Sequence, residues 1–400
     1  MSKRSGLSML WAALGVVVVI GVVITLAVRP AAAAHPPTSF SIAADPDHCG
    51  QGWGAGTPAQ VQGGEQTFTV TNGTVAGMEV YLQAVGTGKV YLDLEGLGAG
   101  SHAGARVALG SGRYRFVCLP ADADPVTGPT VTVGAAPSSL PLTPGIVPVT
   151  RNDLIPVAKA YGAWVSSRIP VLRRQVASLG DDVAQGDLAA AKTAWLSAHL
   201  TYETLGAAYG AFGDLDTAIN GTPAPGRTAL SDPGLAGFHR VEALLYAGAP
   251  ADRILPVVTA LAKAVTALGN AFADAEVDPG AIGLRAHEIV ENAIQFELHG
   301  TTDAGSGTNI ATIGANLQGA SAALQPLGGI LATRYAKLHA TEASLARSQA
   351  LVQSLRRPDG TWPPVGTLSL AQREHLDAAL SETAELLAPV AAICDIRREA

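Results

Sequence analysis

The amino-acid sequence predicts a multidomain protein in which an N-terminal β-sandwich is followed by an all-α helical-bundle domain. Short segments of alternating apolar and polar residues occupy positions 38–134, and long alanine- and leucine-rich segments with a helical period occupy 151–398. A proline-rich stretch without periodicity, residues 135–150, separates them as a semi-rigid linker. With 400 residues, 48% of them hydrophobic and 15% charged, the chain is long and apolar enough to form both cores.

The first 34 residues predict a signal peptide or a membrane anchor. Lys3 and Arg4 precede an apolar run at 9–28, and a helix of roughly 20 apolar residues spans the hydrocarbon core of a bilayer. The small residues of AAAAH at 31–35 also suit cleavage by a signal peptidase, so both alternatives stay open. Because basic residues before such a run stay in the cytoplasm, the remaining chain is expected outside it, in the periplasm or at the cell surface.

The segments within 38–134 predict a small Greek-key sandwich. QTFTVTN, MEVYLQAV, KVYLDLEGL and RYRFVCL are rich in β-branched and aromatic residues, and turns with glycine, asparagine or proline separate them. Six or seven short strands in about 100 residues fit a sandwich of this class. Cys49 and Cys118 lie in this domain, and a disulfide between them is the simplest expectation in an oxidising compartment.

Helical periodicity predicts eight helical segments in the C-terminal domain, with loops rich in glycine and proline between them. They cover about 152–180, 184–213, 235–248, 251–274, 280–299, 309–339, 340–356 and 369–397. Amphipathic helices in this number bury their apolar faces against one another as helix bundles.

Three of these helices carry a histidine and a glutamate three or four residues apart, although the domain has few charges. The pairs are His199–Glu203, His239–Glu242 and His287–Glu291. Such spacings put both side chains on one helix face, so convergence of the three faces would create a metal site like those of carboxylate-rich bundles. The alternative is three solvated surface pairs, each worth a few tenths of a kcal/mol. Carboxylates with one or two imidazoles suit iron, manganese or zinc better than copper(I).

Other residues refine or exclude particular functions. Asp214 and Asp216, in the GDLD sequence, either cap a helix or reach into the same site. Arg240 follows His239 and no second histidine comes four residues later, so the H-E-x-x-H motif of helical zinc proteases is not encoded. The net charge of −7 argues against nucleic acid as a partner, because phosphate binding needs clustered lysine and arginine.

The order of these motifs resembles that of the imelysin-like domain of EfeO-type proteins. The stretches AHLTYETLGAAYGAFGDLDTAIN, GFHRVEALLY and HEIVENAIQFELHG carry the resemblance, and the H-x-x-E signature falls on His239 and Glu242. Members of this family are extracytoplasmic components of iron uptake systems. Their full-length type has a cupredoxin-like domain ahead of the helical domain, so the resemblance covers roughly residues 40–395 and implies a cupredoxin-like fold for the sandwich.

The resemblance implies a site for iron, as Fe(II) or Fe(III), in which zinc is a substitute. The implied ligands are Glu203, Asp216, His239, Glu242 and Glu291. Further candidates, from their spacing or proximity, are Asp214, His199 and His287. Many relatives have a second glutamate three residues after the Glu203 position, where this chain has Gly206, so one potential ligand is lost.

For the N-terminal domain, the resemblance implies a metal site at Cys49, Glu79 and Cys118 as the alternative to a disulfide. Copper bound there could oxidise Fe(II) before transfer to the helical domain. A blue-copper centre needs two histidines, a cysteine and usually an axial methionine. Only His48 and Met78 lie near the matched positions, so an orthodox centre of that kind is not evident.

Three functions are compatible with these observations. The first is an iron-binding component that delivers iron to a membrane permease, in systems that usually also include a haem peroxidase. The second is an imelysin-type metallopeptidase, because a metal with three protein ligands and an open position can hydrolyse peptides. The third is a structural protein of the cell surface in which the histidine–glutamate pairs are inert.

Overall fold

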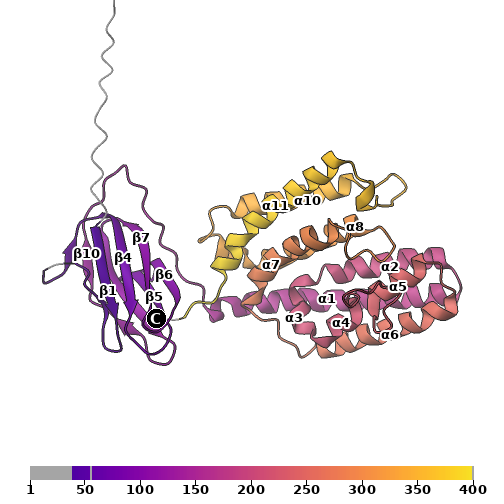
Figure 1. Ribbon diagram of the computed structural model, residues 1–400, viewed down its shortest axis with the longest axis horizontal. Coiled ribbons are helices and arrows are strands. Elements are labelled where there is room, and N and C mark those ends of the chain that lie inside the picture. Colours follow the sequence, from indigo (N-terminus) through magenta and orange to yellow (C-terminus); the bar gives the residue numbers. More distant parts are fainter. Residues whose placement is uncertain (1–37, 55, 399–400) are drawn as a thin grey trace, which may run out of the picture.

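The computed structural model describes residues 38–54 and 56–398 and contains two domains of different class (Figure 1). Residues 38–133 form a sheet-rich domain, and residues 151–393 form an all-helical domain. The predicted fold class is therefore confirmed. The expected signal peptide or membrane anchor at 1–34 lies outside the described residues.

The N-terminal domain consists of two sheets that enclose one core. The first sheet has the order β2–β1–β4–β7, with β1 (Thr38–Ala44), β2 (Cys49–Gln51), β4 (Gly64–Asn72) and β7 (His102–Leu109). The second has the order β3–β10–β8–β5–β6, with β3 (Gln60–Val61), β5 (Met78–Ala84), β6 (Val90–Leu97), β8 (Gly112–Pro120) and β10 (Val131–Val133). β9 (Val126–Thr127) pairs with β8. The β1–β4 and β3–β10 pairs are parallel, and the other pairs are antiparallel.

Aromatic side chains and a disulfide hold the two sheets together. Trp53, Phe68 and Phe116 meet edge to face, with ring centroids 5.2 to 5.5 Å apart, a geometry that adds to the stabilisation from buried area. Cys49 of β2 is bonded to Cys118 of β8. Because these strands belong to different sheets, the disulfide crosses the core.

The helical domain contains two groups of helices packed against each other (Figure 1). One group comprises α1 (Arg151–Ala184), α2 (Leu188–Glu203), α5 (Gly237–Tyr246) and α6 (Ala251–Ala271). The other comprises α7 (Ala281–Asn292), α8 (Asn309–Leu324), α10 (Leu338–Ser354) and α11 (Leu370–Ile393). Among the described residues, α6 is the one helix whose length and apolar composition would suit a membrane span; here it packs on α1 and α5 within the domain.

Three of the predicted helices are interrupted where the apolar period continues. The segment 184–213 breaks after Glu203 into a 3₁₀ turn (Gly206–Ala208) and the short helix α3 (Tyr209–Phe212), and α4 (Asp214–Asn220) follows. The segment 309–339 breaks at Gln325–Leu327, where Pro326 lacks a backbone N–H, and continues as α9 (Gly328–Leu331). In the segment 280–299, α7 ends in a π-helical turn, Ala293–Glu297.

The residues after α11 return to the sandwich and join the two domains. The Arg397 guanidinium lies 3.0 Å from Asp93 Oδ2 and also pairs with Glu95. Arg398 donates a hydrogen bond to the carbonyl of Leu119, at 2.7 Å, and its own carbonyl accepts one from the Tyr81 hydroxyl. Burial, together with the charge of a neighbouring carboxylate, raises the pKa of Asp93 to about 7 although Arg397 opposes the shift.

Replacing Cys49 and Cys118 with serine should destabilise the sandwich by about 2 to 5 kcal/mol, because a crosslink between distant residues restricts the unfolded chain. These cysteines are 69 residues apart. Urea unfolding followed by hydrogen-exchange mass spectrometry of the β4 and β8 peptides measures the loss. The control, Cys394→Ser in the helical domain, should leave those peptides unchanged. Equal unfolding midpoints in the double variant and the control would contradict the prediction.

Candidate metal centre in the helical domain

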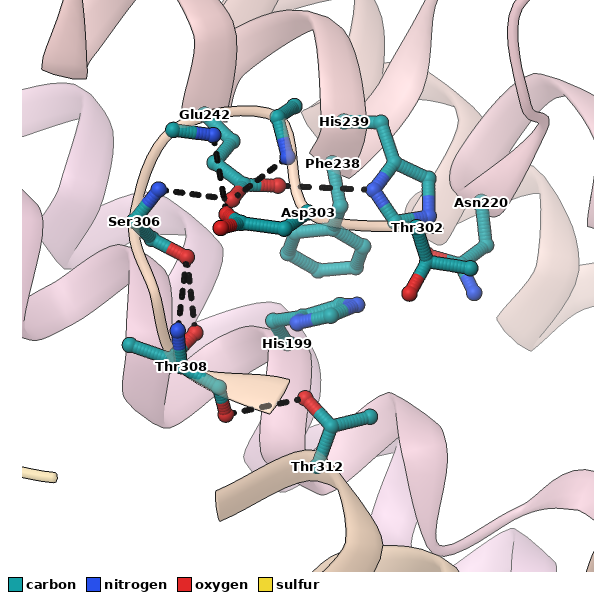
Figure 2. A network of polar contacts seen from close by, with 12 residues as sticks. His199, Asn220, Phe238, His239, Glu242, Thr302, Asp303, Ser306, Thr308 and Thr312 are labelled. Atoms are coloured by element: carbon teal, nitrogen blue, oxygen red, sulfur yellow. Dashed lines mark hydrogen bonds and ion pairs between the residues drawn. The ribbon is translucent and has the colours of Figure 1, made fainter. Parts of the chain in front are cut away.

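Histidine and glutamate side chains from separate elements meet where the two helix groups face each other (Figure 2). His199 and Glu203 come from α2, and His239 and Glu242 come from α5. All four are buried although they are polar. A cavity of about 190 Å³ lies beside them, lined by Glu203, His239, Asn220, Glu297, Thr302 and Asn316 among others.

Local sequence fixes the position of α5. Gly237 starts this helix with φ of +74°, and a Cβ atom there would lie 2.1 Å from the carbonyl oxygen of Ile219. Only glycine therefore allows α5 to begin against the end of α4. The Trp195 indole of α2 donates a hydrogen bond to the Phe238 carbonyl, at 3.0 Å. The two contacts place His239 beside His199, with ring centroids 5.5 Å apart.

Glu203 is held as a carboxylate by His199 and by two neutral amides. Its side-chain oxygens accept hydrogen bonds from Asn220 Nδ2, at 2.7 Å, and Asn316 Nδ2, at 2.8 Å. His199 Nε2 lies 3.2 Å from Glu203 Oε1. Burial raises the pKa of Glu203, but His199 and the two amides lower it more, and the net pKa is about 2. The side chain is therefore ionised at neutral pH.

Glu297, at the end of the π-helical turn, also borders the cavity. Its oxygens accept hydrogen bonds from the Thr302 hydroxyl, at 2.6 Å, and from Asn309 Nδ2, at 2.7 Å. Burial raises its pKa, and the charge of Glu203 raises it further. The spacing of histidine and glutamate did not indicate this residue. The available signal was an acidic residue within the apolar stretch AIQFEL.

The third predicted pair, His287 and Glu291, is not brought to the cavity. The Glu291 side chain is 54% exposed and lies 3.2 Å from His287 Nε2. His287 Nδ1 lies 3.0 Å from the carbonyl of Ala384 on α11. Glu297 lines the cavity, whereas Glu291 is not among the residues that line it.

Asp216 lies behind Glu203 rather than on the cavity. It accepts a hydrogen bond from the Tyr202 hydroxyl. Burial raises its pKa, and the charge of Glu203 acts in the same direction. Asp214 is exposed in the first turn of α4, where a carboxylate favours the helix N-terminus.

Negative charge in this region exceeds positive charge. Among the described residues, no lysine or arginine forms an ion pair with Glu203, Glu242 or Glu297. Arg285, on the rim of the cavity, is paired with Glu288 at 2.6 Å. Burial lowers the pKa of His199, but the surrounding carboxylates raise it more, so the net pKa is raised. Its Nδ1 has no hydrogen-bond partner within the described chain, and its Nε2 has only the 3.2 Å contact with Glu203 Oε1. A bound cation would complete this arrangement.

The N-terminal residues Cys49, Glu79 and Cys118 do not form one site. The two sulfur atoms are bonded to each other, which removes the thiolates that a copper centre would use. Glu79 instead belongs to a group with Asp93 and Glu95. These are the residues of the described chain whose ligand atoms all lie within 4.8 Å of one another. The helical cluster is therefore more widely spaced than a bound metal requires.

The fold and the cluster define a two-domain protein whose helical domain holds a cavity lined by His239 and the carboxylates of Glu203, Glu288 and Glu297. The family model described as Imelysin, peptidase M75, matches residues 157–390, and the chain belongs to this family. The iron uptake system component EfeO of Escherichia coli O157:H7 is 26% identical over 237 residues, which are 57% of this chain and 61% of that protein. The protein of the same name from Yersinia pestis is 30% identical over 198 residues, 48% of this chain and 49% of that protein. The similarity thus spans about half to three fifths of the length of these relatives.

The wild-type protein should lose stability relative to a Glu203→Gln variant as the pH falls from 5 to 2. The pKa of Glu203 in the folded state, about 2, lies below its ordinary value of 4.5. The unfolded chain therefore takes up the proton first, and the stabilisation present above pH 4.5 is lost on acidification. The difference in free energy of unfolding should fall by on the order of 2 to 3 kcal/mol. Urea titrations at stepwise pH measure it. The difference in free energy of unfolding between the wild type and the exposed Glu291→Gln control should stay nearly constant. A constant difference for Glu203→Gln would refute the lowered pKa of Glu203.

Proposed function

We propose that this protein is the extracytoplasmic iron-binding component of an iron uptake system. The observation that carries the proposal is the excess of buried carboxylate around the helical cavity, without an arginine or lysine partner among the described residues. The names of the relatives from Escherichia coli and Yersinia pestis support iron as the cation. Carboxylate oxygens with one or two imidazoles suit Fe(II) and Fe(III).

The proposed iron ligands are the cavity-lining side chains His239, Glu203 and Glu297. His199 contacts Glu203 and lowers its pKa, whereas the charge of Glu203 raises the pKa of Asp216. In the absence of iron, the amides of Asn220 and Asn316 hold Glu203. Iron binding requires the carboxylates to turn from these neutral donors toward a shared ion. Zinc, which accepts the same ligand types, is expected to compete.

The proposed partners follow from the same system. Iron bound outside the cytoplasmic membrane must pass to a membrane permease, and a haem peroxidase is a second expected partner. Residues 1–34 would act as a signal peptide or as the anchor that keeps the protein near the permease. Copper-dependent oxidation at Cys49 and Cys118 is not part of this proposal, because the disulfide removes both thiolates. Oxidation of Fe(II) in the N-terminal domain is not proposed either, because the carboxylates of Glu79, Asp93 and Glu95 cannot accept an electron.

A metallopeptidase is the second candidate, because the matching family model carries a peptidase label. The same cavity would then hold a metal with one open position for water. The buried carboxylates would need to include a general base beside that water. Cleavage of casein by the metal-loaded protein, abolished by the variants described next, would favour this candidate over iron capture.

Substitution of both Glu203 and Glu297 by glutamine should weaken Fe(II) and Fe(III) binding by more than about 100-fold, since even groups that only support a ligand are worth roughly 10- to 100-fold. Isothermal titration of the purified protein under anaerobic and aerobic conditions measures the two affinities. Glu291→Gln provides a matched control from the adjoining helix and should bind iron as the wild type does. Unchanged iron binding in the double variant would refute the proposed site.

A further inference from the structure

Glu242, the glutamate of the H-x-x-E motif, has its carboxylate fully engaged by protein groups. It is only 2% exposed. Its Oε1 accepts hydrogen bonds from the backbone N–H groups of Ala304, at 3.1 Å, and Ser306, at 3.0 Å. Its Oε2 lies 3.4 Å from His239 Nδ1 (Figure 2). One side chain of α5 therefore contacts both the motif histidine and a loop more than 60 residues away.

The loop that Glu242 contacts, residues 300–308, also reaches the cavity. Asp303 Oδ1 accepts hydrogen bonds from the backbone N–H groups of Gly305, at 2.9 Å, and Gly307, at 3.0 Å, which shape the loop from within. Thr302, at the start of the same loop, donates its hydroxyl hydrogen bond to Glu297. Glu242 is thus connected through this loop to Glu297, a carboxylate that lines the cavity.

The contact with Glu242 also determines which nitrogen of His239 is available. An ionised carboxylate can only accept, so a neutral imidazole here carries its hydrogen on Nδ1 and its lone pair on Nε2. Figure 2 shows this second nitrogen directed away from Glu242, toward Asn220 and Thr302, and both of these residues line the cavity. Histidines that bind metals commonly donate their other N–H group to a carboxylate in this way.

We propose that Glu242 is a positioning residue and not an iron ligand. It holds His239 with Nε2 toward the cavity, and it fixes the 300–308 loop so that Thr302 supports Glu297. This inference rests on the proposed function in one respect, the identity of the bound ion as iron. The H-x-x-E motif then supplies one ligand, His239, together with the group that orients it.

Hydrogen exchange of the metal-free protein tests the loop contact. In Glu242→Ala, the amides of Ala304 and Ser306 should exchange at least 10-fold faster than in the wild type. In Glu242→Gln, the retained carbonyl oxygen can accept the same two hydrogen bonds, so exchange should stay within about threefold of the wild type, by the geometry of the amide group. Glu291→Gln, which contacts neither the loop nor His239, is the matched control and should show no change.

Nitrogen-15 NMR of histidine-labelled protein tests the imidazole contact. The metal-free wild type should show His239 with its hydrogen on Nδ1, and added Zn(II) should bind Nε2. In Glu242→Gln the side-chain NH₂ group faces Nδ1, so this tautomer should be lost and Zn(II) affinity should fall about 10- to 100-fold. His239→Ala identifies the resonance.

Zn(II) bound to Nδ1 of His239, or loop amides in Glu242→Ala that exchange as in the wild type, would overturn the proposal. If Glu242→Ala does not fold, as judged by circular dichroism, the nitrogen-15 NMR spectra of the wild type and Glu242→Gln test the proposal without it. A wild-type protein that binds neither iron nor Zn(II) would refute the proposed function. The metal-free exchange and tautomer measurements would still show whether Glu242 positions His239 and the loop.

Discussion

The helical domain depends on a set of buried carboxylates that neutral donors hold in place. Removing an ionised carboxylate from water costs several kcal/mol unless hydrogen bonds or opposite charges offset the loss. Glu203 is satisfied by side-chain amides, Glu242 by loop N–H groups and Glu297 by a hydroxyl and an amide. These donors come from α4, α8 and the 300–308 loop, so the same hydrogen bonds that satisfy the charges also hold the two helix groups together. These donors are neutral, so among the described residues His199 and His239 are the groups that can offset the negative charge.

Backbone fit explains why the cavity takes this shape. Gly237 lets α5 approach the end of α4 closely enough for His239 to lie beside His199. At Gly206, which also lines the cavity, an added Cβ atom would lie 2.9 Å from Ile289 Cγ1. Ile289 thus fills the space on that side of the cavity. The proposed ligand set of Glu203, His239 and Glu297 therefore has an apolar wall at Ile289 beside it.

Much of the fold follows from the local sequence pattern. The site depends partly on contacts between segments far apart in the sequence, which the local pattern does not encode. The change from a period of two to a helical period predicted both domains, and spacings of three and four placed His199 with Glu203 and His239 with Glu242. The same rule placed Glu291 with His287, correctly as neighbours but on the outer face of α7. The contacts of Glu242 with the 300–308 loop were also beyond prediction, because backbone N–H groups are present at every position and leave no signal in the sequence.

The hydrogen-bonded state of the carboxylates bears directly on how iron could be both captured and released. A site whose empty form left several bare charges together would hold its ion permanently, because loss of the ion would cost the full repulsion and desolvation. Here each carboxylate has a neutral partner to return to: Glu203 has Asn220 and Asn316, and Glu297 has Asn309. In the proposed iron site, binding would exchange those hydrogen bonds for metal–oxygen bonds, and release would reverse the exchange. Glu242, if it keeps the loop and His239 fixed in both states, limits the rearrangement to the side chains that touch the ion, which is what a carrier that must pass its cargo onward requires.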